Sequence, residues 1–269
     1  MTATAEVSAE PSTDRESPGT GDPSGTTTAE RLRLLIQPVL VLVVAGAVIF
    51  WAFNRQLTAT QLENINPGDV ATLIWQHLLI TAAVTAIVLA IGIPLGVLVT
   101  RPGAKVLRPL FVGIANVGQA APAIGLLVLL FLLTAQTGFW IGVLPIALYS
   151  LLPVLSSTIL GIDQVDRSLL DAGLGQGMSR RSLLLRVELP LAVPYILAGL
   201  RTSLVLAVGT ATLSFLVNAG GLGILIDTGY KLQDNVTLIL GSVLAVCLAL
   251  LVDWLGGLAE FFLSPKGLR

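Results

Sequence analysis

Charged residues are scarce in this chain of 269 residues: Asp, Glu, Lys and Arg make up 12% of it, against about a quarter in an average soluble domain. Hydrophobic residues make up 54%, and the mean hydropathy is +0.88. This composition excludes an ordinary soluble fold and predicts a membrane protein. The net charge of −1 at pH 7 gives no argument for a nucleic-acid partner.

Histidine and cysteine are almost absent as well. The one histidine, His77, cannot build a histidine metal cluster within one chain and leaves little for a Ser-His-Asp site. The one cysteine, Cys247, cannot form an internal disulfide and lies in an apolar run. The phosphate-binding pattern Gly-x-x-x-x-Gly-Lys-Ser/Thr does not occur. We therefore expect no catalytic residues, no metal and no bound cofactor in this chain.

Six apolar runs are long enough to cross a bilayer, which takes about 20 residues of helix. They predict an all-α membrane protein with six transmembrane helices, over residues 34–53, 73–100, 107–133, 139–162, 191–217 and 236–261. The segment Gly92-Ile93-Pro94-Leu95-Gly96 lies inside the second run, and we expect a kink near Ala90, because Pro94 removes a backbone hydrogen bond. We expect a break in the third run near Pro122, where polar residues cluster.

The composition also divides the chain. Residues 1–30 have too few apolar side chains to offset the entropy of ordering and predict a disordered tail. Residues 31–72 hold the first transmembrane helix and an outer loop with a turn at residues 66–69. Residues 73–261 form a transmembrane core that includes a polar loop at 163–190. A short tail follows at 262–269.

Basic residues fix the orientation that we expect. With the N-terminus inside, thirteen of the fifteen Lys and Arg residues fall on the inner side, and only Arg55 and Lys231 fall outside. Inner loops of membrane proteins carry this excess. Both termini and the loop at 163–190 are therefore predicted to be cytoplasmic.

The loop at 163–190 is too long to be a simple chain reversal. Apolar residues at positions 162, 165, 169 and 172 have helical spacing. Three glycines at 173, 175 and 177 then disfavour a helix. Ser179 can cap a second helix that has Leu183, Leu184 and Val187 on one face. The pattern predicts a helix, a glycine break and a helix at the cytoplasmic surface. An amphipathic loop that only rests on lipid headgroups is the alternative interpretation.

A known motif has the same spacing. The loop resembles the cytoplasmic motif of ABC-importer permeases: Glu-Ala-Ala, three residues, Gly, nine residues, Ile, one residue, Leu-Pro. Here Asp171-Ala172-Gly173 is followed after three residues by Gly177 and after nine more by Val187-Glu188-Leu189-Pro190. Every interval matches over twenty positions. Asp171, Gly173 and Val187 are the departures, and Asp171 shortens the usual Glu by one methylene.

The resemblance implies a type I ABC-importer permease (MetI-like) fold in the cell membrane of a prokaryote. It implies that the segment from Asp171 to about Leu183 is a coupling helix docked on a cytoplasmic ABC ATPase dimer. That dimer binds ATP and Mg. The other implied partners are a second permease copy or homologue, an external substrate-binding protein and membrane lipid. The implied coupling residues are Asp171, Ala172, Gly173, Gly177, Met178, Ser179, Arg180, Leu189 and Pro190.

Further segments resemble a narrower group, the permeases of osmoprotectant importers, which take up glycine betaine, choline, carnitine or related quaternary amines. These segments are residues 77–81, 91–96, 119–122, 148–153, 161–166 and 219–223. The resemblance covers about residues 73–255. Two departures are Ser156-Ser157, where that group has a pair such as Arg-Asn, and Asn218, where a Gly is common.

Polar residues within the apolar runs are candidates for lining a translocation path. Hydrogen bonds between helices are the alternative explanation for them. Tyr149 would offer a ring face to a quaternary ammonium, or would pack as an ordinary tyrosine. His77 is expected near the outer interface without a functional role. The candidates are Asn116, Gln119, Tyr149, Ser156, Ser157 and Asn218.

Other functions remain open at this point. An ABC importer for another small solute, such as an amino acid or a sulfonate, is one alternative. A stand-alone secondary transporter would need carboxylates at the membrane midplane and usually internal repeats, and neither is apparent. An intramembrane enzyme would need a catalytic set that the chain does not provide.

Overall fold

The computed structural model describes residues 24–263, with the backbone alone for residues 24–35, 59, 60 and 63. Helix α1 begins at Ser24, inside the segment 1–30 for which the composition predicts a disordered tail. The predicted tails otherwise lie mostly outside the described residues.

The described chain is helical, and residues 24–263 contain no strand. A 3₁₀ turn covers Lys105–Leu107, a second one covers Thr212–Val217, and a π-helical segment covers Leu184–Glu188. The α-helices are α1 (Ser24–Phe53), α2 (Ala59–Asn64), α3 (Pro67–Thr100), α4 (Arg108–Ala120), α5 (Ala123–Thr134), α6 (Phe139–Asp163), α7 (Arg167–Gly175), α8 (Arg180–Leu183), α9 (Leu189–Ala211), α10 (Gly223–Lys231) and α11 (Asn235–Leu263).

Five helical segments are long and apolar enough to cross a membrane: α1, α3, α6, α9 with its flanking turns, and α11. The remaining predicted span, at residues 107–133, corresponds to the pair α4 and α5, whose axes are bent by 101° relative to each other. The expected break near Pro122 is confirmed, because α4 ends at Ala120 and α5 begins at Ala123. Counted with this broken pair, the described chain has the six spans that the sequence predicts.

Helix α3 runs through Gly92-Ile93-Pro94 without a break, and the kink expected near Ala90 stays a prediction. The small residues there admit α6: a Cβ on Gly92 would lie 3.1 Å from a methyl of Val154. The predicted turn at residues 66–69 is instead the start of α3. Asn66 caps it by accepting a hydrogen bond from the Gly68 amide at 3.1 Å, and Pro67 occupies the first turn, where its missing N–H costs little.

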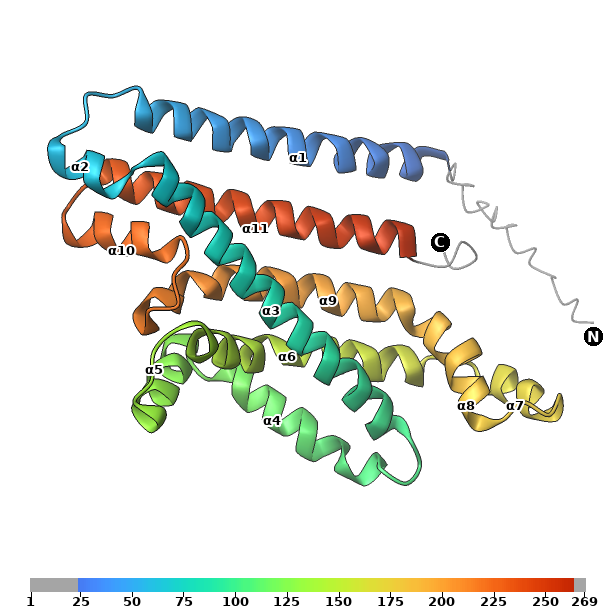
Figure 1. Ribbon diagram of the computed structural model, residues 1–269. Helices are drawn as coiled ribbons and strands as arrows, with labels where there is room; N and C mark the ends of the chain where they lie inside the picture. Colours follow the sequence, from blue (N-terminus) through green and yellow to red (C-terminus); the bar gives the residue numbers. More distant parts are fainter. Residues whose placement is uncertain (1–23, 264–269) are drawn as a thin grey trace, which may run out of the picture.

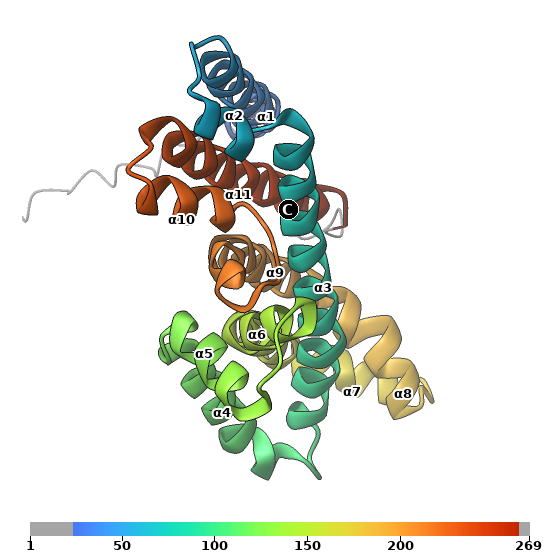
Figure 2. The same cartoon turned by 60° about the vertical axis from the view of Figure 1, so that its left-hand side comes forward.

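The long helices form a layer with one crossing helix. α1, α11, α9, α6 and α4 lie side by side in that order, and each packs against the next (Figure 1). α3 passes over this layer and packs on α6 and α9 (Figure 2). A buried apolar cluster fills the crossing: Ile80, Val84 and Val88 from α3 meet Ile146 from α6 and Ala207 from α9. α3 therefore connects helices that are not adjacent in sequence.

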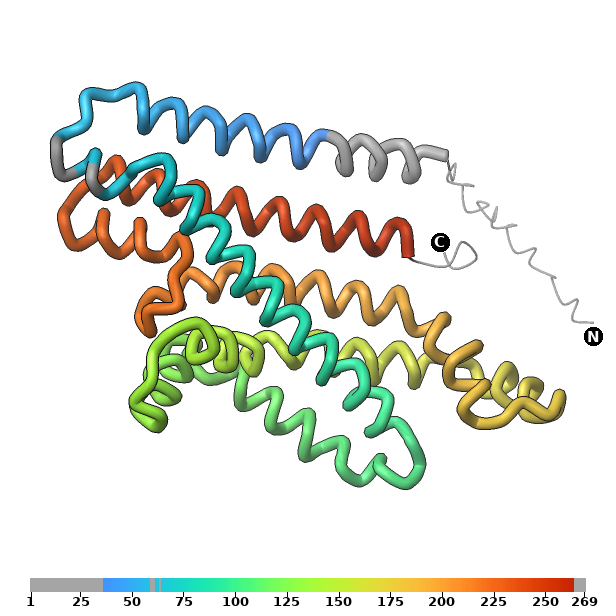
Figure 3. The backbone as a smooth tube through the Cα atoms, in the orientation of Figure 1, coloured from blue at the N-terminus to red at the C-terminus, as the bar shows by residue number. Residues whose placement is uncertain are grey.

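Successive spans run in opposite directions, which gives the molecule two ends (Figure 3). The end that carries α7 and α8, between α6 and α9, is called the hairpin end here. The end that carries α2 and α10 is called the opposite end. The last described turns of α11 lie toward the hairpin end (Figure 1).

Candidate functional site

Within residues 163–190, α7 and α8 form a helical hairpin (residues 166–183) at the hairpin end, beyond the ends of α6 and α9 (Figure 1). α6 ends at Asp163, and Asp166 caps α7 by accepting a hydrogen bond from the Ser168 amide at 2.9 Å. Hydrogen bonds from the backbone and the side chain of Ser168 lower the pKa of the exposed Asp166 carboxyl. An ionised carboxylate at this place also favours the α7 dipole.

Gly177 makes the break between the two helices. Its φ is +81°, a left-handed conformation that glycine adopts without a steric cost. The Gly177 amide bonds the carbonyl of Leu174 at 2.9 Å, and the Met178 amide bonds the carbonyl of Gly173 at 3.1 Å. This pair of bonds is the Schellman motif, which satisfies the last carbonyls of a helix. The predicted sequence of helix, glycine break and helix is confirmed.

The two arms of the hairpin touch at Gly173. A Cβ on this buried glycine would lie 2.6 Å from Cδ1 of Leu183, which is itself buried. Gly173, a departure from the alanine of the motif, therefore lets α8 approach α7 closely. Ser179 caps α8 by accepting a hydrogen bond from the Ser182 amide at 3.2 Å, as predicted.

The outer face of the hairpin is open. Asp171, Ala172, Ser179 and Arg180 are exposed. Leu169 and Leu174 on α7 are also exposed, by 49% and 44%. The predicted apolar face through positions 162, 165, 169 and 172 is therefore wrong, because Asp166 starts a new helix and changes the phase. The result is a surface of apolar and charged side chains with no partner among the described residues.

The hairpin joins α9 through the π-helical segment Leu184–Glu188. Pro190 has no N–H to donate to the Arg186 carbonyl, and the N–H of Leu189 bonds the Leu184 carbonyl five residues back. Below this joint, a small cluster holds Ile162 of α6 against Ala192 and Ile196 of α9, with Leu189 packed on it.

Glu188 is a buried acid that the sequence reading did not single out. It is 5% exposed, and both of its oxygens bond Arg101 just after the end of α3. The Arg101 Nη1 to Glu188 Oε1 distance is 3.1 Å. Sequence gives no signal for this ion pair, because the partners lie 87 residues apart.

The six path candidates do not form one cluster. Asn116 and Gln119 lie one turn apart on α4, and the Asn116 amide donates to the Val112 carbonyl of its own helix at 2.9 Å. Tyr149 and Ser156 lie seven residues apart on α6, so they share one of its faces. Ser157 lies instead against α9: a Cβ added to Gly199 of that helix would lie 2.5 Å from the Cβ of Ser157. Within the described residues no hydrogen bond joins two of the six.

Asn218 and the glycines after it lie in a loop at the opposite end. Asn218 is exposed, has a φ of +55° and ends the 3₁₀ turn Thr212–Val217. The loop is held by α3: Gln76 accepts the Gly221 amide at 3.2 Å, and Nδ1 of His77 accepts the Leu222 amide at 3.3 Å. The loop is therefore fixed to a span.

His77 is fully buried within the protein, with an exposure of 0%. Its Nε2 lies 3.0 Å from the carbonyl of Val208 in the last turn of α9. Since Nδ1 accepts a hydrogen bond, Nε2 carries the proton and donates to Val208. One neutral histidine thus links α3, α9 and the loop.

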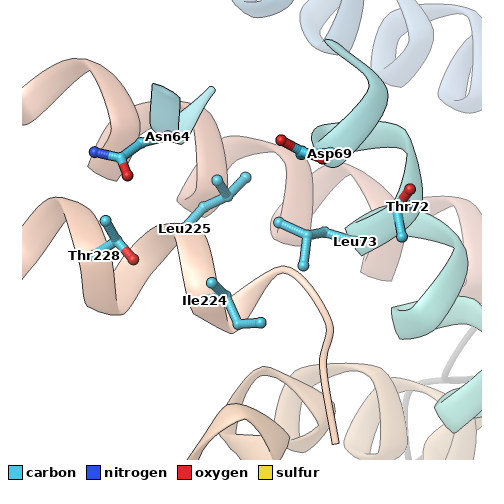
Figure 4. Close-up of a pocket in the computed structure, with 7 residues that line it drawn as sticks. All are labelled: Asn64, Asp69, Thr72, Leu73, Ile224, Leu225 and Thr228. Atoms are coloured by element: carbon cyan, nitrogen blue, oxygen red, sulfur yellow. The ribbon is translucent and has the colours of Figure 1, made fainter. Parts of the chain in front are cut away.

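A pocket of about 300 Å³ opens at the opposite end between α3 and α10 (Figure 4). Asp69 and Thr72 line it from α3, Thr228 from α10, and Asn64 from α2. A second hollow of about 480 Å³ is apolar and runs along α4, over Leu110, Ile114 and Val117. Groups of three or more His, Cys, Asp or Glu that could hold a metal are absent from the described part of the chain.

Residues 92–263 match the family described as "Binding-protein-dependent transport system inner membrane component". The chain is 38% identical over 208 residues to the osmoprotectant import permease protein OsmW of Salmonella typhimurium, covering 76% of this chain and 96% of that protein. It is 39% identical over 192 residues to the carnitine transport permease protein OpuCD of Listeria monocytogenes, covering 71% and 85%. It is 34% identical over 211 residues to the choline transport system permease protein OpuBB of Bacillus subtilis, covering 78% and 95%.

Among solved structures, an inward-facing conformation of the MetNI methionine ABC transporter has a chain with a similar fold. The TM-score is 0.64 and the sequence identity 22%, over 78% of this chain and 100% of that one. This likeness shows the MetI-like fold, as the sequence predicts.

Proposed function

The chain belongs to the family of binding-protein-dependent transport system inner membrane components, and from this premise we propose that it carries quaternary-amine osmoprotectants into the cell. It is a permease subunit of an ABC importer and lies in the inner membrane. Glycine betaine, choline and carnitine are the proposed solutes, because curated relatives at 33–39% identity are named for them.

The observation that carries the proposal is the hairpin with its Gly177 break. It lies beyond the spans and exposes Leu169, Leu174 and Arg180, a mixed surface suited to a protein partner. We infer that an ABC ATPase dimer, which binds the ATP and Mg, docks on this surface. Its closure would move the hairpins and turn the spans from inward-facing to outward-facing. Asp171 to Arg180 would make the contacts, and Leu189-Pro190 would pass the movement to α9.

The distribution of basic residues supports a cytoplasmic hairpin end. Seven basic residues lie at this end, in the turn after α3, the start of α4, the α7–α8 hairpin and the π-helical segment: Arg101, Lys105, Arg108, Arg167, Arg180, Arg181 and Arg186. The opposite end has Arg55 and Lys231. Inner loops carry such an excess. The opposite end would then face the external binding protein, which delivers the solute.

The translocation path would lie on the side of the layer formed by α4 and α6. Asn116 and Gln119 on α4 and Tyr149 and Ser156 on α6 are the retained candidates, and a second permease copy would close this side. Ser157, which contacts α9, is a weaker one. The runner-up function is an importer of another small solute, such as an amino acid or a sulfonate.

One experiment tests coupling and substrate together. The permease, its ATPase and its binding protein are reconstituted in liposomes, and ATP hydrolysis and uptake of labelled glycine betaine, choline and carnitine are measured. Valine at position 177 would be strained at a φ of +81°, and the left-handed region costs an L-residue about 1–2 kcal/mol. We expect Gly177→Val to insert and to hydrolyse ATP while uptake falls by roughly tenfold.

Gly175→Ala is the matched control, because Gly175 lies two residues earlier, has open space around it and has no positive φ. This variant should transport normally. Normal uptake by Gly177→Val would refute the coupling role of the hairpin. Uptake of none of the three amines by the unmodified complex would refute the substrate class.

A further inference from the structure

The ion pair between Arg101 and Glu188 joins two parts of the molecule that are distant in sequence. Arg101 follows the last residue of α3, and Glu188 is the last residue of the π-helical segment between the hairpin and α9. Each terminal nitrogen of the guanidinium donates to one carboxylate oxygen: Nη1 to Oε1 and Nη2 to Oε2 of Glu188. Such a bidentate pair fixes direction as well as distance.

Arg101 is also tied to its own helix. Its Nε donates to the Val97 carbonyl at 3.2 Å, and its Nη2 donates to the Thr100 hydroxyl at 3.1 Å. The guanidinium is therefore held in the last turn of α3. A displacement of Glu188 must either carry α3 along or break charge-assisted hydrogen bonds.

Burial distinguishes this pair from the other ion pairs among the described residues. The Glu188 side chain is 7% exposed, whereas the acids of the other pairs are 22% exposed or more. Exposed pairs contribute little to stability or rigidity. Breaking a buried pair leaves a charge without compensation, which is strongly destabilising. The Arg101–Glu188 pair therefore has the most buried acid of these pairs, and separating the two side chains would leave that carboxylate uncompensated.

The pair lies at a joint that is otherwise weak. The π-helical segment has wider turns than an α-helix, and Pro190 removes one backbone bond from it. A short segment of this kind would let the hairpin tilt against α9. The bond to α3 removes that freedom, because it anchors the segment's last residue from the side.

We propose that Arg101 and Glu188 are positioning residues that make the hairpin, α3 and the start of α9 move as one body when the ATPase displaces the hairpin. This inference rests on the proposed coupling function and adds the residues through which the movement reaches α3. Without the pair, the hairpin would follow the ATPase while the spans lag behind. ATP would then be hydrolysed with little transport.

Two variants separate this role from simple stability. Arg101→Lys keeps the charge opposite Glu188 but loses the fork that makes two parallel bonds. Glu188→Gln leaves the remaining charge on Arg101, which is the more exposed partner at 33%. Arg108→Lys is the matched control, since Arg108 pairs with Asp163 at the same end but both side chains are exposed.

The experiment has two readouts on the reconstituted complex. The first is uptake per ATP hydrolysed. The second is the distance between spin labels at Leu98→Cys on α3 and Leu185→Cys on the π-helical segment, both exposed positions, in a Cys247→Ser background diluted with unlabelled chain. The unmodified protein should keep one distance with and without ATP. In Arg101→Lys, ATP should change or broaden that distance, and uptake per ATP should fall roughly fivefold or more.

Arg108→Lys should match the unmodified protein in both readouts. The inference is overturned if Arg101→Lys, and Glu188→Gln where it assembles, also match it. The label distances do not depend on the solute. If the unmodified complex takes up no quaternary amine, the substrate proposal fails, and the distances still decide the role of the pair.

Discussion

Gly177 has no side chain and Pro190 has no amide hydrogen, and each absence shapes the hairpin end. Gly177 allows the left-handed turn that ends α7, and Pro190 withdraws a donor from the segment before α9. Both residues belong to the spaced motif in the sequence. Their positions in the motif therefore have a physical cause: one permits a backbone conformation, and the other prevents a hydrogen bond.

His77 carries the clearest prediction for a single side chain. His77→Phe keeps a ring in the site but removes the hydrogen bond to the Val208 carbonyl and leaves the buried Leu222 amide without its acceptor. We expect the protein to lose about 2–4 kcal/mol of stability. The measurement is thermal or denaturant unfolding of the purified protein in detergent.

Thr85→Val is the control for that change, because the Thr85 hydroxyl bonds only the Thr81 carbonyl of its own helix. It should cost less than about 1 kcal/mol. Equal losses for both variants would mean that the histidine does not bind the loop to α3 and α9.

At the scale of elements, short helices at the opposite end are tied to long ones by side-chain caps. Asp234 precedes α11, accepts the Val236 amide at 3.0 Å and accepts Gln61 of α2 at 2.8 Å. Partial burial raises the pKa of Asp234, but hydrogen bonds from Thr237, Gln61 and two backbone amides outweigh it, so the pKa lies below its ordinary value of 3.8.

This lowered pKa predicts a pH dependence for the start of α11. A carboxyl whose pKa is depressed in the folded state contributes stability above its unfolded value, and that contribution is lost as the pH falls through the folded value. The cap should therefore be intact at pH 5 and above and weaken below about 3.8. Hydrogen exchange at the first amides of α11 should accelerate there, after correction for the intrinsic rate.

In Asp234→Asn, which cannot titrate, the same amides should show no such acid-dependent change. Acceleration of equal size in that variant would assign the effect to another group.

At the scale of the whole molecule, one edge of the helix layer is unpaired. Leu110, Ile114 and Val117 project from α4 with exposures of 55%, 50% and 71% along the apolar hollow. Lipid would cover such a face, but the proposed complex includes a second permease copy, and the path candidates lie on α4 and the neighbouring α6. A second copy against this edge would enclose them.

Cross-linking tests that arrangement. In a Cys247→Ser background, we expect Val117→Cys to give covalent dimers in membranes with a short bifunctional thiol reagent. Val43→Cys is the control: it is 61% exposed on α1, at the other edge of the layer. Dimers formed equally well through position 43, and not through 117, would place the second copy elsewhere.

The sequence predicted the parts of this structure that local signals encode. The six spans follow from long apolar runs, and the hairpin follows from Ser179, Gly177 and the spaced motif. The short helices α2 and α10 were not predicted. In α10, Asp227 and Gly229 interrupt the apolar pattern that would have indicated a helix. The contacts that the small residues at 92–96 make with α6 were not predicted, because they depend on how the two helices pack. Pairings such as Arg101 with Glu188 arise only when distant helices meet.

The hairpin satisfies the backbone groups at its helix ends with residues of its own. Asp166 caps its first helix, the amides after Gly173 satisfy the end of that helix, Ser179 caps the second, and Leu183 packs on Gly173. Its shape is thus encoded within about twenty consecutive residues and does not depend on the side chains that line the spans. In evolutionary terms, we expect the hairpin to behave as a module: if it is the ATPase contact, a permease could change the solute that it carries while it keeps the same ATPase.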